Sequence, residues 1–342
     1  TRDEDFVENL FVASTHSYIL IFSDKGRVYW LKVHEIPQAG RAARGKPIVN
    51  LVQLSQGEKV AAILPVRELS AQAGAGGADP LDGEGEGDGV EAAPAAVAGT
   101  FVIAATRRGL VKKTPLAAYA RPRPSGIIAL SIEEGDSLIA ARITDGQGHI
   151  LLSTAHGIAI RFEESEVRPT GRSAYGVKGI TLEKGDEVVS AESLPPTQEG
   201  AIAATILSVT ANGYGKRTGL SEYRIQMRGG RGIITIKATE RNGAVVAALP
   251  VVEADEVMLI TNRGMLIRMP AGQISLIGRN TQGVRLISLE SREEQVAGVA
   301  RVAENVTVSD ENGEVGNGEA ENGEAAGEAG SGGDGSPEGE PA

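Results

Sequence analysis

One pattern occurs five times in this 342-residue chain: a strand-like apolar run that ends in Ser or Thr, then two further residues, then a glycine. The closing glycines are Gly26, Gly109, Gly157, Gly213 and Gly264. They lie 83, 48, 56 and 51 residues apart, and the first interval falls to 53 when an insert of 30 residues, 70–99, is subtracted. A repeat of about fifty residues therefore runs through the chain, and it constrains the fold more than any local pattern does.

A second glycine follows each first one after 17 to 19 residues, at Gly45, Gly126, Gly176, Gly232 and Gly283. Apolar or alternating runs and polar turns follow it, so each unit holds about four short strands with period-2 patterning and no sustained helical period. Four-stranded units repeated at this length are typical of propeller blades, so the sequence predicts an all-β radial fold. Turn geometry alone can explain the first glycines, because a hairpin tip needs positive φ.

The net charge of −11, from 34 Lys and Arg against 45 Asp and Glu, conceals a basic body. Residues 70–99 hold six acids, residues 303–342 hold eleven, and neither segment has a Lys or Arg. The other 272 residues hold 34 bases against 28 acids, a net charge of +6. The two acidic segments have too few apolar residues to fold, so we expect a disordered insert and a disordered tail around a domain of residues 1–302. A polyanionic partner remains compatible with this body.

Several function classes are disfavoured by the sequence. No apolar run approaches the ~18 residues of a membrane span, and the first residues, TRDEDFVEN, do not resemble a signal peptide, so we expect a cytoplasmic protein. The chain has no Cys, and its four His show no ligand spacing. We therefore expect no metal site and no cofactor in this chain.

Basic residues recur at matching points of the repeat, just beyond the first glycine and near the second. Equivalent positions of a radial repeat face the same way, which predicts a continuous basic band. The predicted DNA contacts are Arg27, Arg41, Arg44, Lys46, Arg107, Arg108, Lys112, Lys113, Arg121, Arg123, Arg172, Lys178, Lys216, Arg217, Arg228, Arg231, Arg268, Arg279 and Arg285, and Arg161 occupies a matching position. Any single one of them could instead be a solvated surface charge.

A basic band on a disc suits a bent duplex, since backbone contacts need only cations spaced along the phosphates. Bending ~40 bp through ~180° costs on the order of ten kcal/mol. About eight phosphate contacts give a salt slope near −7, which can offset that cost at low salt. Double-stranded DNA is therefore the predicted partner, bound with strong salt dependence and weak sequence dependence.

The most distinctive stretch, YRIQMRGGRGIITIK at 223–237, combines glycines with cations. Its glycines permit close backbone approach, and N–H groups between Arg228 and Arg231 could hold a phosphate. A plain glycine loop between blades is the alternative. Neither this stretch nor GYGKRT at 213–218 fits a nucleotide P-loop.

Four strings, DEDFVENLFVASTHSYILIFSDKGRVYWLKVHEIP, RGKPIVNLVQL, NGYGKRTGLSEYR and IGRNTQGVRLI, resemble the C-terminal domain of the bacterial DNA gyrase A protein, and the likeness covers residues 1–302. The resemblance implies a six-bladed β-pinwheel whose blades exchange strands and whose basic rim wraps duplex DNA with positive handedness. It also implies a holoenzyme with the gyrase A N-terminal region and the gyrase B subunit, where ATP and Mg act on other domains and negative supercoils are introduced. The isolated domain is expected to be a monomer.

The family's hallmark is the gyrase A box, QRRGGKG. Six residues match it, with Arg for Lys at 231 and Met227 in place of a base: Gln226, Arg228, Gly229, Gly230, Arg231 and Gly232. The family's usual order places the principal box before Thr1, so we interpret 226–232 as a second, box-like copy in a later blade. With five repeats instead of six, the isolated chain is expected to form an open disc that wraps poorly. The family's catalytic tyrosine belongs to a region absent here, so this chain is not expected to cleave DNA.

Three alternatives remain open at this stage. The C-terminal domain of topoisomerase IV shares the blade unit but lacks a good box and chiral wrapping, and a propeller could also be a protein-interaction scaffold. An enzymatic role is weakest, because carboxylate pairs such as Glu133/Glu134 and Glu163/Glu164 lie in polar turns. The acidic tail is either a solubilising end or a tethered competitor for the basic band, in which case deleting 303–342 should tighten DNA binding.

Overall fold

The computed structural model describes residues 13–39, 45–66, 99–121, 123–196, 204–291 and 293–302. The chain divides into two compact units, Thr1–Glu304 and Asn305–Ala342, and every described residue belongs to the first. The tail at 303–342 and all of the acidic insert except its last residue lie outside the described residues. Their predicted disorder and the tail's predicted competition with DNA therefore stay predictions.

The described residues of the first unit contain short strands and 3-10 helices and no α-helix, as the period-2 patterning predicts. The strands are β1 (Tyr18–Ser23), β2 (Arg27–Lys32), β3 (Val60–Val66), β4 (Phe101–Thr106), β5 (Leu110–Pro115), β6 (Ile127–Ile128), β7 (Leu138–Thr144), β8 (His149–Thr154), β9 (Ile158–Glu163), β10 (Val177–Lys178), β11 (Val188–Leu194), β12 (Thr205–Thr210), β13 (Tyr214–Gly219), β14 (Ile233–Ile234), β15 (Val245–Val251), β16 (Glu256–Thr261), β17 (Leu266–Pro270), β18 (Val284–Arg285) and β19 (Val296–Val302). The 3-10 helices are η1 (Val33–Glu35), η2 (Ile48–Asn50), η3 (Leu116–Tyr119), η4 (Glu164–Glu166), η5 (Leu220–Glu222) and η6 (Ala271–Gln273).

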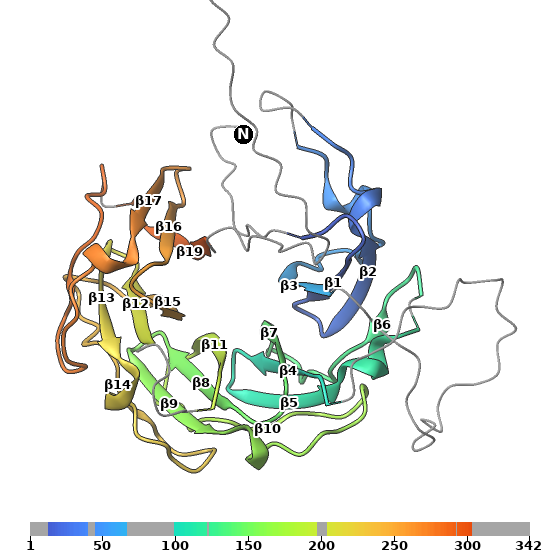
Figure 1. The fold of residues 1–342 in the computed structure, drawn as a ribbon, viewed down its shortest axis with the longest axis horizontal. Helices are drawn as coiled ribbons and strands as arrows, with labels where there is room; N and C mark the ends of the chain where they lie inside the picture. Colours follow the sequence, from blue (N-terminus) through green and yellow to red (C-terminus); the bar gives the residue numbers. More distant parts are fainter. Residues whose placement is uncertain are drawn as a thin grey trace, which may run out of the picture. The chain divides into compact units, whose positions relative to one another are not determined.

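These strands form five antiparallel blades that follow one another along an arc (Figure 1). From the inside outward they are blade 1 (β3-β1-β2-β6), blade 2 (β7-β4-β5-β10), blade 3 (β11-β8-β9-β14), blade 4 (β15-β12-β13-β18) and blade 5 (β19-β16-β17). Each two-residue outermost strand belongs in sequence to the next repeat: β6 follows the hairpin of blade 2 but pairs with β2, placing Ile128 opposite Arg27. The all-β pinwheel with exchanged strands, predicted from the repeats and the resemblance, is therefore confirmed, with five blades in this chain.

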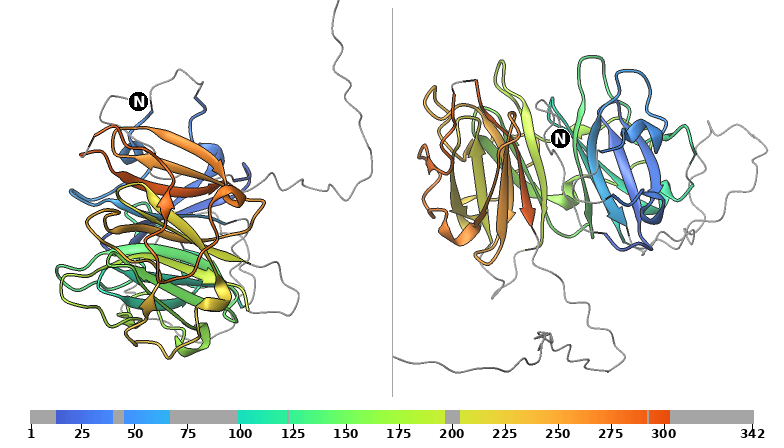
Figure 2. Two further views of the ribbon diagram at one scale, coloured as in Figure 1. Left: turned by 90° about the vertical axis from the view of Figure 1, so that its left-hand side faces the viewer. Right: turned by 90° about the horizontal axis from the view of Figure 1, so that it is seen from above.

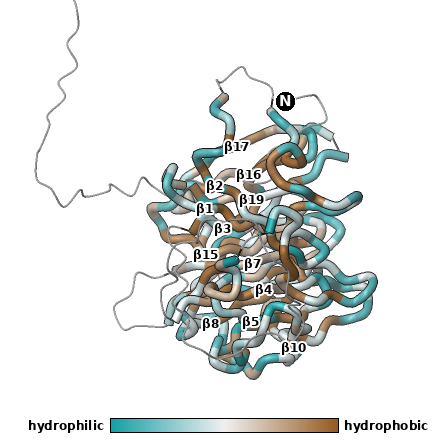
Figure 3. The backbone as a smooth tube through the Cα atoms, turned by 90° about the vertical axis from the view of Figure 1, so that its right-hand side faces the viewer, coloured by the Kyte–Doolittle hydropathy of each residue, from teal (hydrophilic) through white to brown (hydrophobic). Residues whose placement is uncertain are grey.

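The hydrophobic core lies between neighbouring blades. Leu20 and Phe22 of blade 1 pack with Val102 and Leu138 of blade 2, and further clusters join blade 2 to blade 3 and blade 4 to blade 5. The strands cross the thickness of the arc in both views of Figure 2, and hydrophobic segments concentrate in them in Figure 3. Each sheet thus buries its faces against adjacent sheets, as the propeller argument requires.

The repeated Ser/Thr-x-x-Gly pattern has a local role and a longer-range one. In blade 1 the Ser23 hydroxyl accepts a hydrogen bond from the Arg27 N–H at 3.2 Å, and the Ser23 carbonyl accepts one from Gly26 at 3.0 Å, which closes the hairpin turn. The Gly26 carbonyl then accepts hydrogen bonds from the Ala129 and Leu130 N–H groups of the crossing strand at 2.8 and 3.1 Å. Gly109, Gly157 and Gly213 accept equivalent pairs from the next repeat. The first glycine therefore fixes the strand exchange as well as the turn.

We expect Gly157→Ala to destabilise the domain more than Gly185→Ala does. Both glycines have positive φ, +83° and +81°, but a Cβ on Gly157 would lie 2.1 Å from the Ile236 carbonyl oxygen, whereas nothing lies within 4 Å of one on Gly185. Gly157→Ala should lower the free energy of unfolding by about 1 to 3 kcal/mol beyond the loss in Gly185→Ala, measured by urea unfolding. Equal losses in the two variants would show that backbone strain alone requires the glycine.

Candidate nucleic-acid interface

Exposed cations gather where the repeats exchange strands. We define the outer rim as the strands β6, β10, β14 and β18 together with the loops that precede them; these strands lie at the outer side of each four-stranded blade (Figure 1). Its exposed basic residues from the predicted set are Arg121, Arg123, Lys178, Arg231 and Arg285. The strand exchange therefore places cations from successive repeats along one edge of the structure.

Three further arginines of the predicted set tie neighbouring outermost strands together. Arg172, Arg228 and Arg279 each stand four residues before the second glycine of their repeat. Their guanidinium groups donate to the carbonyl oxygens of Ile128, Lys178 and Ile234, at 3.4, 2.6 and 2.9 Å. Each of these carbonyls belongs to the outermost strand of the preceding blade. These arginines therefore connect adjacent parts of the outer rim by hydrogen bonds.

The box-like stretch forms a tightly held loop, which corrects one prediction. The Arg228 N–H donates to the Glu166 carboxylate at 2.8 Å, and the Gly229 N–H donates to the Gly179 carbonyl at 2.7 Å. The Gly230 N–H donates to Met227 at 3.4 Å. These donors are used within the protein, so they do not form the predicted phosphate nest. The predicted close approach of the backbone is present, since a Cβ on Gly232 would lie 2.6 Å from a carbonyl oxygen.

Four predicted DNA contacts are buried inside the blades, which is a second correction. Lys112 donates to the carbonyls of Ala129 and Arg172. Lys216 donates to the Gly278 carbonyl and, at 2.7 Å, to the Arg279 carbonyl. The four residues are Lys112, Lys113, Lys216 and Arg217, with exposures of 0 to 6%. They hold segments of the next repeat, and Lys112 also holds Ala129 of its own repeat, so their charge does not face a ligand.

Lys113 and Arg217, the next residues along the same two strands, also direct their charge into the protein. Lys113 lies 3.6 Å from the Glu164 carboxylate, and Arg217 donates to the Ile274 carbonyl at 2.9 Å. Arg161, at the matching point of blade 3, is also buried and donates to the Tyr223 carbonyl at 3.3 Å. The basic residues in the middle of these hairpin strands therefore hold the segments that lead to the outer rim.

The remaining predicted residues are dispersed. Arg27 donates to the Ser125 and Gly126 carbonyls at 2.5 and 3.0 Å, and Lys46 is exposed ahead of η2. Arg107 and Arg108 are exposed at the tip of the β4–β5 hairpin, where Arg107 pairs with Glu187 at 3.7 Å. Arg268 in β17 forms an ion pair with Glu256. Arg41 and Arg44 lie outside the described residues.

Sequence reasoning missed three cations near the rim. Arg168 and Arg224 are exposed and both stand eight residues before a second glycine, a spacing that could have revealed them. Arg241 and Arg285 lie over the Tyr214 ring, 5.1 and 5.5 Å from its centroid. The hydrogen bond from Arg285 lowers the pKa of the Tyr214 hydroxyl, and Arg241 acts in the same direction. No sequence pattern indicates this aromatic contact.

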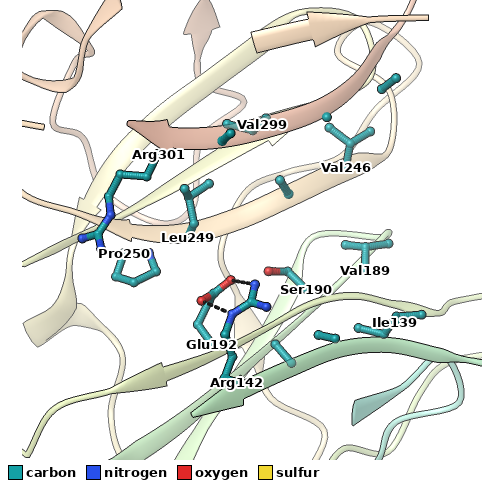
Figure 4. A pocket seen from close by; sticks show the side chains of 16 residues that line it. Ile139, Arg142, Val189, Ser190, Glu192, Val246, Leu249, Pro250, Val299 and Arg301 are labelled. Atoms are coloured by element: carbon teal, nitrogen blue, oxygen red, sulfur yellow. Dashed lines mark hydrogen bonds and ion pairs between the residues drawn. The ribbon is translucent and has the colours of Figure 1, made fainter. Parts of the chain in front are cut away.

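The inner side of the arc offers little for ligand chemistry. A cavity there is lined by the inner strands β7, β11, β15 and β19 (Figure 4). Its Arg142 and Glu192 pair at 2.7 Å, and Ser190 donates to the Ala248 carbonyl at 2.6 Å, so these polar groups already have partners within the protein.

Among the described residues no group of three His, Asp or Glu is placed to hold a metal ion. In that same part of the chain, no helix has the length and apolar character to cross a membrane.

Lys216 gives a pH-dependent test of the internal supports. Burial lowers the pKa of its ammonium group from 10.5 to about 8. Between those values the unfolded chain binds the proton and the folded chain does not, so raising the pH favours the folded state. We expect the stability of the wild type relative to Lys216→Met to rise by about 1 to 3 kcal/mol from pH 7.5 to 10.5 in urea unfolding. Lys237→Met, which removes an exposed lysine, is the control, and a pH-independent difference for Lys216→Met would contradict the assignment.

The repeats match the sequence model of the "DNA gyrase C-terminal domain, beta-propeller" family over residues 17–67, 100–145, 148–195, 204–251 and 255–303. Each match begins near a hairpin and ends at an inner strand, so the family's unit coincides with the repeat read from the sequence. The matches cover more than half of the chain. The chain therefore belongs to the DNA gyrase C-terminal domain family.

Curated relatives agree with this assignment. The chain is 46% identical to the DNA gyrase A protein of Pseudomonas aeruginosa over 91% of its length and 43% identical to that of Escherichia coli over 90%. It spans 35% and 31% of those two proteins, about a third of their length.

Solved structures support the fold. A DNA gyrase A C-terminal domain matches with a TM-score of 0.67 and 22% identity, over 87% of this chain and 90% of that one. A topoisomerase IV C-terminal domain matches equally well, with a TM-score of 0.67 and 24% identity, over 84% of this chain and 80% of that one. At these identities the structures establish the propeller architecture alone.

Proposed function

We propose that this chain is the DNA-wrapping domain of a gyrase A protein and binds a bent duplex along its outer rim. The observation that carries the proposal is the repetition of exposed cations on the exchanged strands and the loops before them: Arg121 and Arg123 at blade 1, Lys178 at blade 2, Arg231 at blade 3 and Arg285 at blade 4. A curved row of phosphate contacts of this kind is what a wrapped duplex needs, because backbone contacts carry no sequence requirement.

The other charges support this function indirectly. Arg172, Arg228 and Arg279 each use a donor on a neighbouring strand, so the outermost strands keep fixed positions while the exposed cations face solvent. A backbone that is already fixed loses little conformational entropy on binding, which helps to offset the elastic cost of bending DNA. We expect fewer phosphate contacts than the predicted set of cations suggests, because four of its members are buried.

We propose that DNA cleavage and ATP hydrolysis are carried out by other parts of the parent enzyme. We propose that its partners in the cytoplasm are the gyrase A N-terminal region and the gyrase B subunit, and that ATP and Mg act on those parts. Tyr119 and Tyr223 are buried here, and burial raises the pKa of Tyr119 to about 12 and raises that of Tyr223 as well. A raised pKa opposes the ionisation that a nucleophilic tyrosine requires. These two tyrosines are therefore unsuited to nucleophilic attack, and because the resemblance places the catalytic tyrosine in another region of the parent protein, we propose that this chain by itself does not cleave DNA.

The direct test is ligation of a nicked plasmid in the presence of the full chain, followed by measurement of the linking number. Positive chiral wrapping predicts a positive shift that grows with protein concentration and disappears at high salt. Binding without any shift would favour the achiral DNA binding expected of the topoisomerase IV alternative, whose solved domain has the same TM-score. No binding at low salt would favour the scaffold alternative.

Removing rim cations should reduce the number of released counterions. We expect a Lys178→Ala, Arg231→Ala double variant to lower DNA affinity and to make the salt slope shallower by about 2, because each lost phosphate contact changes it by about 1. Arg268→Ala is the control, since Arg268 is exposed but pairs with Glu256, and its strand β17 is paired with no exchanged strand. Fluorescence anisotropy with a 40-bp duplex, at several salt concentrations, measures both quantities. An unchanged slope in the double variant, or an equal loss in the control, would contradict the rim assignment.

A further inference from the structure

The outer rim carries exposed apolar side chains among its cations. Met227 is 82% exposed, the highest value among the large hydrophobic residues that the structure describes as exposed. Ile225 is 48% exposed and Leu276 is 58% exposed. Contiguous exposed apolar surface marks interaction sites, whereas singly exposed apolar side chains are common, so the arrangement of these residues decides their significance.

The apolar positions follow the repeat. Pro169, Ile225 and Leu276 each stand seven residues before the second glycine, and all three are exposed. Each forms a parallel bridge to the same point of the preceding blade, at Lys113, Arg161 and Arg217 respectively. Their backbones are therefore fixed by the buried basic residues of the hairpins, which sets a regular apolar series along the rim.

Met227 lies on a rigid turn beside this series. The Gly230 N–H donates to the Met227 carbonyl, and Gly229 has a φ of +81°, which is the geometry of a type II turn over 227–230. The Gln226 N–H donates to the Arg161 carbonyl at 2.8 Å, and the Arg228 N–H donates to Glu166 at 2.8 Å. The backbone on both sides of Met227 is therefore tied to the preceding repeat while its side chain projects into solvent.

We propose that Met227, supported by Ile225, makes an apolar contact in a groove of the bound duplex and so selects where along the DNA the wrap is positioned. This inference rests on the proposed function. Exposed Arg224 and Arg231 flank the pair and favour a polyanion over a protein partner. Between phosphates, the apolar groups that a duplex offers are the thymine methyl in the major groove and the deoxyribose walls. A flexible, polarizable methionine fits either surface.

The residue type at this position supports the idea. Met227 is an apolar side chain in a loop whose neighbours Arg228 and Arg231 are cationic. A phosphate contact contributes affinity that falls with salt, whereas an apolar contact contributes affinity that does not. The Met227 loop should therefore add a salt-independent, position-dependent component to binding.

The test compares the full chain with Met227→Ala, Met227→Leu and Met227→Arg on thymine-containing and uracil-containing duplexes. We expect Met227→Ala to lose about three- to tenfold in affinity with an unchanged salt slope and to lose preferred positions in hydroxyl-radical footprints of a long fragment. Met227→Leu should retain both, and Met227→Arg should steepen the slope by about 1. Leu266→Ala, which truncates an exposed apolar residue of β17, a strand paired with no exchanged strand, is the control.

The uracil duplex distinguishes the two apolar surfaces. If the effect of Met227→Ala disappears when thymine methyls are removed, the contact is a thymine methyl and the inference holds. If the effect persists, the contact is a deoxyribose wall, which is the same at every nucleotide, and the selection of position is overturned. Wild-type affinity and footprints in Met227→Ala, with DNA binding intact, would overturn this inference and leave the wrapping function standing. Absence of DNA binding by the wild type would overturn the proposed function itself. A loss of DNA affinity in Leu266→Ala equal to that in Met227→Ala would attribute the effect to general surface hydrophobicity and would overturn the inference.

Discussion

The hydrogen bonds between the first glycine of one repeat and the crossing strand of the next hold this structure together. In four successive blades a single carbonyl, at Gly26, Gly109, Gly157 or Gly213, accepts two N–H groups from the following repeat. This interaction closes the outer edge of a blade with a strand that its own repeat does not supply, and it places each second-glycine loop on the neighbouring blade. Among the described strands, β17 is the hairpin strand without such a donated partner. The rim exists because the repeats exchange these short strands.

The basic residues divide into three groups with different physical roles. Buried lysines and arginines in the hairpin strands donate to carbonyls of the crossing loops, which compensates part of the cost of burying their charge. Arginines before the second glycine tie adjacent outermost strands to one another. The third group stays exposed on the rim. Internal supports and exposed cations therefore lie on different but adjoining elements, so a substitution in the first two groups would alter DNA binding through the fold.

Much of the fold could be predicted from the sequence, because turn chemistry and repetition are local signals. The Ser/Thr-x-x-Gly pattern marked every hairpin, and the second glycine marked every crossing. Whether each basic side chain points into the protein or into solvent could not be predicted in the same way. In β5, residues 111–114 are all buried, since the crossing loop covers the face that alternation would leave in solvent. Lys112 and Lys113 are therefore both inside, and the period-2 rule fails where a second repeat contributes the covering layer. The position eight residues before the second glycine would have added Arg168 and Arg224 to the predicted rim.

Arginine footprinting tests the central claim most directly, because it asks which cations a bound duplex covers. The full chain is treated with phenylglyoxal with and without a 40-bp duplex at low salt, and modification is quantified by mass spectrometry. We predict that DNA protects Arg121, Arg123 and Arg231 of the outer rim while exposed Arg107 and Arg263, at hairpin turns, stay reactive. Protection concentrated on the hairpin turns, with the rim arginines equally reactive in both samples, would contradict a duplex bound along the rim.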